Sequence, residues 1–201
     1  ILLLDKLPGE TGLCESIAPG KSQGGCHASL MHRFSCFFFI TMRDPDARLL
    51  VMTSGNTSGA PICRDDEEAA EGFPISVTAF FPQQEERIRA DDSVMDFYKG
   101  EPYMIRRSRG YAPLPFMVST PWKGQVIAAG GELKNTFCIG VDNRFYPSPY
   151  VEIWRIFDGK ALKETIGRLE TLLEVKPEVV VCDLHPKYNS TVVAEELGFR
   201  F

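Results

Sequence analysis

The sequence predicts a mixed α/β (α+β) fold, because strand and helix patterns alternate in the last third of the chain. Apolar residues recur at helical spacing between positions 160 and 174, which predicts an amphipathic helix. The β-branched run Glu178–Cys182 then predicts a buried strand that ends next to Asp183. Such alternation is typical of helices packed on a sheet. The residues of the helical stripe are Leu162, Ile166, Leu169, Leu172 and Leu173.

Closely spaced prolines divide the chain into two predicted domains. Neither a helix nor a central strand continues through a segment that contains Pro113, Pro115 and Pro121. We therefore predict one domain at residues 1–118 and a second at residues 119–201.

Three elements are predicted before these prolines. The apolar run Arg48–Met52 enters a turn of glycine, serine and asparagine, as a buried strand does before a loop. Acidic residues begin the segment 65–71, where negative charge favours the start of a helix. Tyr103–Ile105 predicts a short strand.

A strand–turn–strand unit is predicted after the prolines, and a helix is predicted near the end of the chain. Ser190 or Thr191 is expected to cap this last helix, which runs to Leu197. The unit comprises a strand at 125–129, a turn at 130–135, a strand at 136–141 and a hairpin turn at Asp142–Asn143.

Composition and charge limit the function. The 201 residues are 44% apolar and 24% charged, and the formal net charge of −5 predicts no overall basic surface for nucleic acid. No apolar run reaches the roughly 20 residues of a membrane helix and no signal-peptide pattern is present, so we expect a cytoplasmic protein with no membrane partner. None of the six cysteines forms a C-x-x-C pair, which favours reduced thiols and no metal site.

Polar groups suited to an anion follow the predicted strand at 48–52. Ser54 and Asn56 flank a glycine, where backbone N–H groups can converge on a phosphate; the alternative is an ordinary Asx turn. Asp91–Ser93 could position a metal or a ribose hydroxyl. Asp91 and Asp92 are neighbours, and adjacent side chains in a strand point to opposite faces, so at most one of these two carboxylates serves a given site.

Arginines follow the strand at 103–105. Arg106 and Arg107 can bind phosphate through paired, charge-assisted hydrogen bonds. The alternative is a solvated loop whose arginines pair with carboxylates such as Asp91 and Asp92.

Glycine, lysine and asparagine occupy the turn of the second domain. Gly130, Gly131, Lys134 and Asn135 lack the following helix of a P-loop, so they predict a phosphate-binding β-hairpin; the alternative is a tight hairpin with an exposed lysine. Asp183 is a further candidate because it ends a strand. The nearby His185 is either a site residue or a structural histidine of the loop.

Five motifs occur in one order along both predicted domains. They are T-S-G-N-T-S-G-x-P-I from Thr53, R-x-D-D-S-V from Arg89, I-R-R-S-R-G-Y-A-P-x-P from Ile105, G-G-E-L-K-N-T-F from Gly130 and C-D-L-H-P-x-Y from Cys182. Each is weak alone, but together they resemble the carbamoyltransferases of nickel–iron hydrogenase maturation, the HypF family.

This resemblance implies a fold and a reaction. Residues 1–118 would be the later part of a YrdC-like domain with a twisted mixed sheet, and residues 119–201 the beginning of an actin/sugar-kinase-like (ribonuclease H-like) domain. In the family, carbamoyl phosphate yields carbamate, which ATP captures as carbamoyl adenylate with loss of pyrophosphate. The carbamoyl group then passes to the C-terminal cysteine of a partner hydrogenase-maturation protein, towards the cyanide ligand of the hydrogenase iron. ATP and Mg²⁺ are therefore the expected cofactors.

The resemblance also implies roles for the candidate residues. Ser54, Asn56 and Ser93 would line the nucleotide and carbamate pocket of the first domain, and Arg106 or Arg107 would offset charge on the α-phosphate. No catalytic residue is assigned. The family's acylphosphatase domain, zinc modules and metal-binding histidines would lie outside this chain, so iron or zinc is expected only there and the fragment is expected to be inactive alone. The implied phosphate-binding residues of the second domain are Gly130, Gly131, Lys134, Asn135 and Asp183.

Residues 21–41, 74–86 and 151–160 depart from the family pattern in a way that a shifted reading frame explains. The family has a run beginning Gly-Asp after the position of Tyr150, and back-translation of Val151–Ile156 with one restored G gives V-G-D-M-E-D. A shifted frame destroys binary patterning. The cysteines and histidines within 21–41 therefore carry no metal-site prediction.

Two other functions stay open at the level of sequence. One is a threonylcarbamoyl-adenylate synthase of tRNA modification, against which the motifs from Gly130 and Cys182 argue, because a single-domain synthase would not continue into a second nucleotide fold. The other is an RNA-binding module, which the net acidity disfavours and which a steep salt dependence of RNA binding would favour.

Overall fold

The chain forms two compact units. The first unit comprises Ile1–Thr53 with Asp92–Arg106, and the second comprises Ser54–Asp91 with Arg107–Phe201. The predicted strand at 48–52 lies outside the described residues, and the domain boundary at residue 118 stays a prediction. The computed structural model describes residues 1–6, 20–26, 63, 66–72, 90–119, 123–132, 134–152 and 158–197.

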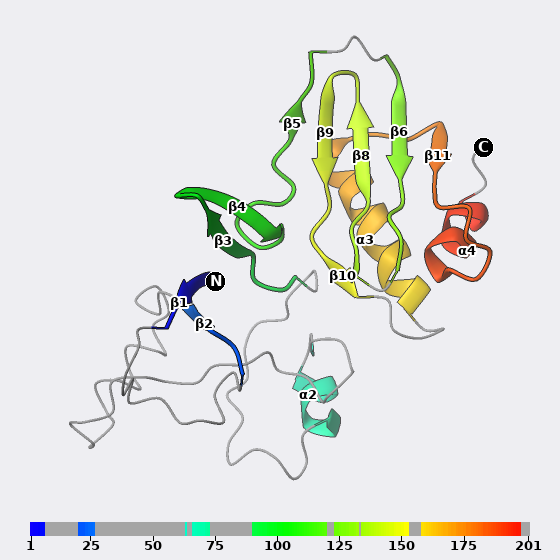
Figure 1. Ribbon diagram of the computed structural model, residues 1–201. Helices are drawn as coiled ribbons and strands as arrows, with labels where there is room; N and C mark the ends of the chain where they lie inside the picture. The colour runs from blue at the N-terminus through cyan, green and yellow to red at the C-terminus, as the bar shows by residue number, and fades with distance from the viewer. Residues whose placement is uncertain are drawn as a thin grey trace. The chain divides into compact units, whose positions relative to one another are not determined.

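The first unit contains a four-stranded mixed sheet, in agreement with the predicted fold class (Figure 1). β1 pairs antiparallel with β2 and parallel with β3, and β3 and β4 form a hairpin. The hairpin turn is Lys99–Gly100, both residues of which have positive φ, as a two-residue turn between twisted strands requires. The predicted strand at 103–105 is confirmed within β4. The strands are β1 (Leu2–Asp5), β2 (Gln23–Cys26), β3 (Val94–Tyr98) and β4 (Glu101–Arg106).

The second unit contains a five-stranded sheet in the order β11-β6-β8-β9-β5. β6 runs parallel to β11, and the other pairs are antiparallel. The predicted hairpin turn Asp142–Asn143 is confirmed between β8 and β9, where Asp142 has a φ of 52°. The strands are β5 (Phe116–Met117), β6 (Gln125–Ala128), β8 (Cys138–Val141), β9 (Arg144–Pro147) and β11 (Val179–Val181); β7 (Lys134–Asn135) pairs separately with β10 (Val151–Glu152).

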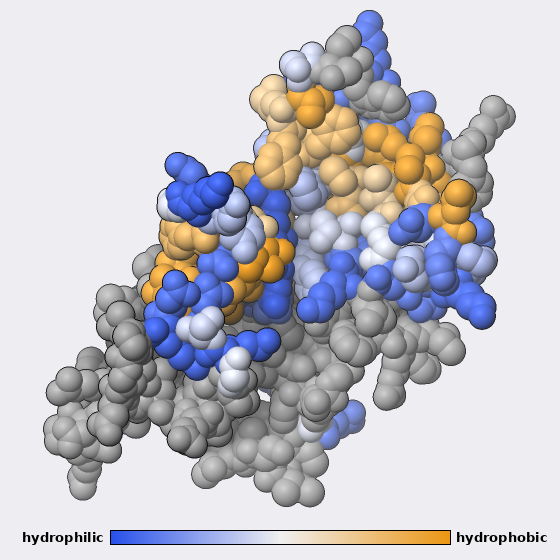
Figure 2. All heavy atoms as spheres, viewed as in Figure 1, coloured by the Kyte–Doolittle hydropathy of each residue, from blue (hydrophilic) through white to orange (hydrophobic). Residues whose placement is uncertain are grey.

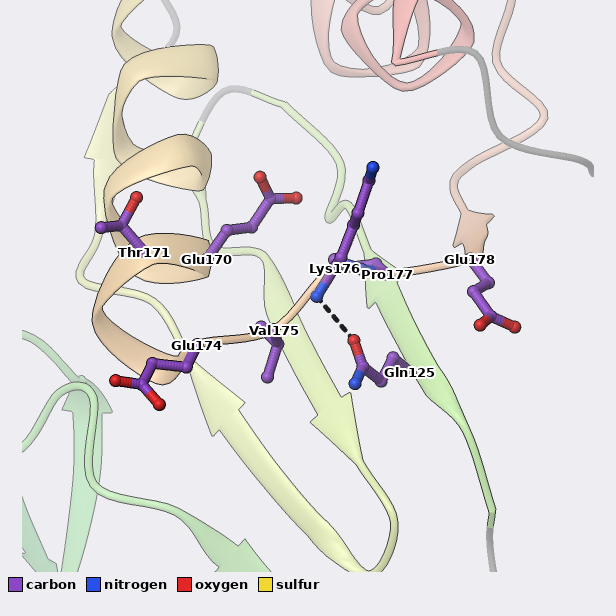
Figure 3. Close-up of a pocket in the computed structure, with 8 residues that line it drawn as sticks. All are labelled: Gln125, Glu170, Thr171, Glu174, Val175, Lys176, Pro177 and Glu178. Carbon is purple, nitrogen blue, oxygen red and sulfur yellow. Dashed lines mark hydrogen bonds between the residues drawn. The ribbon is translucent and has the colours of Figure 1, made fainter.

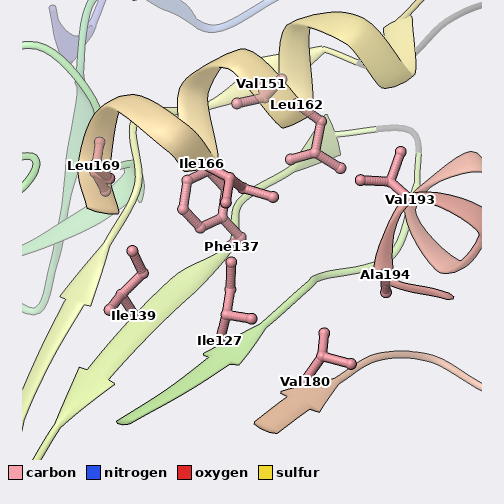
Figure 4. Close-up of a cluster of buried hydrophobic side chains, with 10 residues drawn as sticks. All are labelled: Ile127, Phe137, Ile139, Val151, Leu162, Ile166, Leu169, Val180, Val193 and Ala194. Atoms are coloured by element: carbon pink, nitrogen blue, oxygen red, sulfur yellow. The ribbon is translucent and has the colours of Figure 1, made fainter. Parts of the chain in front are cut away.

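Two helices pack on one face of this sheet and build the hydrophobic core (Figure 4). α3 (Asp158–Leu173) confirms the predicted amphipathic helix, and α4 (Asn189–Glu196) confirms the last helix. Leu172 is the exception in the predicted stripe, with 64% exposure. Because a helix turns about 100° per residue, the side chain of Leu172 points about 80° away from that of Leu162 around the helix axis, outside the buried stripe. The core consists of Ile127, Phe137, Ile139, Val151, Leu162, Ile166, Leu169, Val180, Val193 and Ala194.

The opposite face of the sheet is also apolar. Because side chains alternate along a strand, the buried position of Ile127 on the helix side places Val126 and Ala128 on the other side. This face is more open, since the edge residues Phe116 and Val181 are each 53% exposed. Figure 2 shows apolar side chains gathered over the sheet on this side.

The predicted helix at 65–71 is confirmed as α2 (Asp66–Gly72). Within the described part of the chain, none of the helices is long and apolar enough to cross a membrane.

Candidate phosphate-binding turn

The glycine turn and Asp183 lie together because two parallel strands end side by side. β6 and β11 run in the same direction with Ala128 opposite Val181, and the Ala129 N–H donates to the carbonyl of Val181 at 2.8 Å. Gly130 follows β6 and Asp183 follows β11, so both stand at the carboxyl edge of the parallel pair. This edge is where open α/β sheets bind their ligands.

Gly130 and Asn135 fix the shape of the turn. The Asn135 side-chain amide donates to the carbonyl of Gly130, although Asn135 has no exposed surface. A Cβ on Gly130 would lie 2.6 Å from the Thr136 carbonyl oxygen, so this position tolerates only glycine without a backbone shift. Asn135 Oδ1 is buried and has no hydrogen-bond partner among the described residues. Because the side-chain N–H points at Gly130, the other side-chain atom, Oδ1, is the hydrogen-bond acceptor of this amide.

Gly131 brings the turn against the segment that follows β11. A Cβ at Gly131 would lie 2.7 Å from Asp183 Oδ2 and 3.3 Å from the ring of Tyr188. The Tyr188 ring stacks on His185 with 4.1 Å between ring centroids. His185 therefore contributes to a stacked pair beside the turn, and its Nδ1 accepts a hydrogen bond from the Lys187 N–H at 3.3 Å.

The turn differs from the predicted simple hairpin. β6 and β8 do pair, with Ala128 opposite Cys138, but the predicted second strand begins at Cys138 rather than at 136. Lys134 and Asn135 form β7, which pairs with β10 outside the main sheet. The side chain of Lys134 in β7 is exposed. The alternation of apolar and polar residues does not reveal a strand such as β7, because two residues are too few to show a period.

The start of α4 differs from the prediction as well. Tyr188 occupies the N-cap position and makes no side-chain capping bond. Ser190 lies inside the first turn of the helix, and the Thr191 hydroxyl donates to the carbonyl of Asp183 at 3.1 Å. The acceptor for the Ser190 N–H is Glu132, at 3.0 Å. Sequence reasoning missed Glu132; its one signal is that it is the only acidic residue in the G-G-E-L-K-N turn.

The candidate residues of the first predicted domain are placed only in part. Ser54 and Asn56 lie outside the described residues. Ser93 is 8% exposed, and its carbonyl accepts a hydrogen bond from the Ile1 amino group at 2.7 Å. Arg106 ends β4 and donates to the backbone carbonyl of Asp92 at 3.3 Å.

Arg107 is engaged with the segment that follows it. Its guanidinium donates to the carbonyl of Leu114 at 3.0 Å and lies 4.4 Å from the centre of the Phe116 ring. The Tyr111 ring is a second aromatic neighbour, at 5.9 Å. Cation–π contacts of this kind hold a loop against an arginine, so Arg107 stabilises the segment 111–116 in this structure.

A separate open groove of about 830 Å³ lies at the other edge of the parallel pair, near the start of β6 and β11 (Figure 3). Gln125 lines it and accepts a hydrogen bond from the Lys176 N–H at 2.6 Å. Three carboxylates line it, and partial burial raises the pKa of Glu170 while the nearby Lys176 acts in the opposite direction. The groove contains none of the predicted site residues, and it lies at the amino ends of the two strands.

Thiols and metal ligands add little to this site. The four cysteines in the described ranges are thiols and not disulfides, and burial raises the pKa of the Cys138 thiol, which favours its protonated form. Among the described residues, no group of three or more histidine, cysteine or acidic side chains is arranged to hold a metal ion.

Two family models match the chain, one on each side of the proline-rich segment. The family described as telomere recombination, which comprises the Sua5, YciO and YrdC proteins, matches residues 2–108. The HypF Kae1-like domain matches residues 122–201. A single-domain synthase does not account for this second match.

Curated relatives and solved structures agree with these models. The carbamoyltransferase HypF of Synechocystis sp. is 32% identical over 200 residues, covering 97% of this chain and 25% of the relative, and that of Rhizobium leguminosarum is 36% identical over 153 residues, covering 74% and 20%. A crystal structure of full-length HypF in a phosphate- and nucleotide-bound form has a TM-score of 0.68 and 38% identity, covering 74% of this chain and 24% of that one. The structure of T. kodakarensis HypF also has a TM-score of 0.68, with 35% identity and coverage of 75% and 20%.

The chain therefore belongs to the HypF carbamoyltransferase family, with a YrdC-like part followed by part of the Kae1-like domain. It spans between a fifth and a quarter of the length of these relatives.

Proposed function

We propose that this chain is part of a carbamoyltransferase and that the turn Gly130–Asn135 binds the phosphates of ATP. The observation that carries the proposal is the close packing of Gly131 against Asp183. A Cβ placed on Gly131 would lie 2.7 Å from Asp183 Oδ2. This contact brings the glycine turn and the Asp183 carboxylate together at the carboxyl edge of a parallel strand pair. One similar HypF structure was solved in a phosphate- and nucleotide-bound form, which supports a nucleotide as a ligand of the family.

The donor set of the turn fits a magnesium nucleotide. The backbone of Gly130 and Gly131 has no side chains to keep a phosphate away, and Lys134 supplies an exposed positive charge. Asn135 Oδ1 and the Asp183 carboxylate are oxygen donors, which Mg²⁺ or its bound waters prefer. The magnesium ion would neutralise phosphate charge there. The chain's own residues hold and orient the phosphates.

The proposed reaction follows the family. Carbamate from carbamoyl phosphate is joined to the AMP part of ATP as carbamoyl adenylate, and pyrophosphate leaves. The carbamoyl carbon is then attacked by the C-terminal cysteine thiolate of a hydrogenase-maturation protein, which forms a thiocarboxamide and releases AMP. The proposal places this reaction in the cytoplasm.

In the first predicted domain, Ser54, Asn56 and Ser93 are proposed to line the nucleotide and carbamate pocket. Arg106 or Arg107 is proposed to offset charge on the α-phosphate, which a guanidinium does through paired hydrogen bonds. For Arg107 to serve there it would have to give up its contacts with Leu114 and Phe116. Arg106 would likewise have to give up its bond to the Asp92 carbonyl, so both arginines stay candidates.

Calorimetric titration of the chain with Mg-ATP tests the proposed turn. We expect Lys134→Met and Asp183→Asn each to weaken binding about tenfold or more, in line with one lost charged contact. Lys160→Met, at an exposed position of α3, is the matched control and should bind as the wild type does. Equal affinities for all four proteins would contradict the assignment of the turn.

A further inference from the structure

Helix α4 receives its N-terminal cap from a distant part of the chain. Its N-cap residue Tyr188 makes no capping hydrogen bond, and its first turn contains no acidic residue. The N–H of Ser190 instead donates to Glu132 Oε1 at 3.0 Å, across 58 positions of sequence. A carboxylate at a helix N-terminus satisfies a free N–H group and complements the helix dipole.

This bond forms in a shielded place. Ser190 is 1% exposed, and Glu132 is half-buried in the turn between β6 and β7. A charge-assisted hydrogen bond of low solvent exposure is stronger than its surface equivalent. Losing the acceptor would leave the Ser190 N–H without a partner in a place that water reaches poorly.

The same turn touches the segment after β11 at a second point. Gly131 packs against Asp183 and Tyr188, as described above. Asp183 is in turn held to the helix, because its carbonyl accepts the Thr191 hydroxyl at 3.1 Å. The contacts thus form a closed ring from Glu132 through the first turn of α4 to Asp183 and back to Gly131.

We infer that Glu132 is a positioning residue that fixes the glycine turn relative to Asp183 by capping α4. Because its side-chain oxygen already accepts the Ser190 N–H, we assign it no contact with a phosphate. Loss of the acceptor oxygen should loosen both the start of α4 and the turn, because the ring is then open. The consequence for ATP rests on the proposed function; the structural coupling does not.

Hydrogen exchange of the whole chain tests the coupling. Glu132→Ala removes the acceptor, Glu132→Asp withdraws it by one methylene, and Glu132→Gln keeps a neutral oxygen at the same reach. We expect amides at 189–192 and at 129–132 to exchange about tenfold faster in the alanine and aspartate variants, and the glutamine variant to recover most of the protection. Glu195→Ala, at an exposed position of α4, is the control and should change neither region.

The outcomes separate a coupling residue from a local cap. Faster exchange at 189–192 with an unchanged turn would overturn the inference, and so would unchanged exchange in both regions. If the alanine variant does not fold, the comparison of aspartate with glutamine decides the matter, because both carry a carbonyl-type oxygen and differ in reach.

Binding of Mg-ATP gives a second readout. If the wild-type chain binds, affinity should fall about five- to tenfold in Glu132→Asp and recover in Glu132→Gln. Equal affinity in the two variants, together with a loosened turn, would overturn the link between positioning and binding. No binding by the wild type would instead refute the proposed function, while the exchange experiment would still decide the role of Glu132.

Discussion

Substitution of Gly130 by alanine should destabilise the second unit because its Cβ meets backbone rather than a side chain. The Cβ would lie 2.6 Å from the Thr136 carbonyl oxygen, closer than real Cβ contacts allow. Thr136 directly follows β7 and precedes the buried Phe137, so it cannot move without disturbing the core. Overpacking of this kind costs about 1–3 kcal/mol, and we expect about 2 kcal/mol here.

Two other glycines provide the comparison. At Gly131 the near atom is Asp183 Oδ2, the end of an exposed side chain that can rotate away, so alanine should cost less than about 1 kcal/mol. Gly167 lies inside α3 with nothing within 4 Å of a Cβ, and alanine there should stabilise the helix by about 0.5–1 kcal/mol.

Urea unfolding followed by circular dichroism measures this series, since α3 and α4 both belong to the second unit. The expected order of stability is Gly167→Ala, wild type, Gly131→Ala and then Gly130→Ala. A Gly130→Ala protein as stable as the wild type would refute the geometry of the turn. Gly131→Ala should nevertheless weaken Mg-ATP binding, because it displaces Asp183.

The remaining predictions concern the core, the groove and the completeness of the chain. Val180→Ala should cost about 2 kcal/mol and Val181→Ala much less in urea unfolding, because the first side chain is 3% exposed and the second 53%; equal costs would contradict the assigned faces of β11. Burial raises the pKa of Glu170, so its folded-state pKa exceeds the unfolded value and stability falls as pH rises through the folded pKa. Glu170→Gln should therefore be more stable than the wild type at pH 7 and equally stable at pH 4 in thermal unfolding; a parallel offset at both pH values would contradict this. Finally, the chain incubated with ATP and carbamoyl phosphate should release no pyrophosphate above background, and a measurable burst would show that it holds a complete active site.

Elements with a clear period could be predicted from the sequence. The stripe of Leu162, Ile166 and Leu169 specifies α3, and the β-branched residues of β11 specify a buried strand, because each pattern matches the geometry of its element over several residues. The exposure of Leu172 could not be predicted from residue type, since leucine is apolar, but its angle of about 80° from Leu162 already places it at the margin of the stripe.

Part of the candidate site could also be predicted from the sequence, and part could not. Glycine, lysine, asparagine and aspartate at strand ends indicated the turn at 130–135 and Asp183, and the parallel pairing of β6 and β11 brings these two segments together. The cap on α4 could not be predicted, because Glu132 and Ser190 are distant in sequence and local capping rules favour Ser190 or Thr191. The contacts of Arg107 with Leu114 and Phe116 were missed for a related reason: an arginine suits phosphate and aromatic rings alike.

Amide chemical shifts during a titration with Mg-ATP report directly on phosphate binding by the turn Gly130–Asn135, because the two glycines would bind the phosphates with their own N–H groups. We expect saturable shifts at Gly130, Gly131 and Asn135, with Gly167 in α3 unchanged. Shifts confined to Gln125 and Lys176 in the groove at the opposite edge of the sheet, or no shifts at saturating nucleotide, would contradict it.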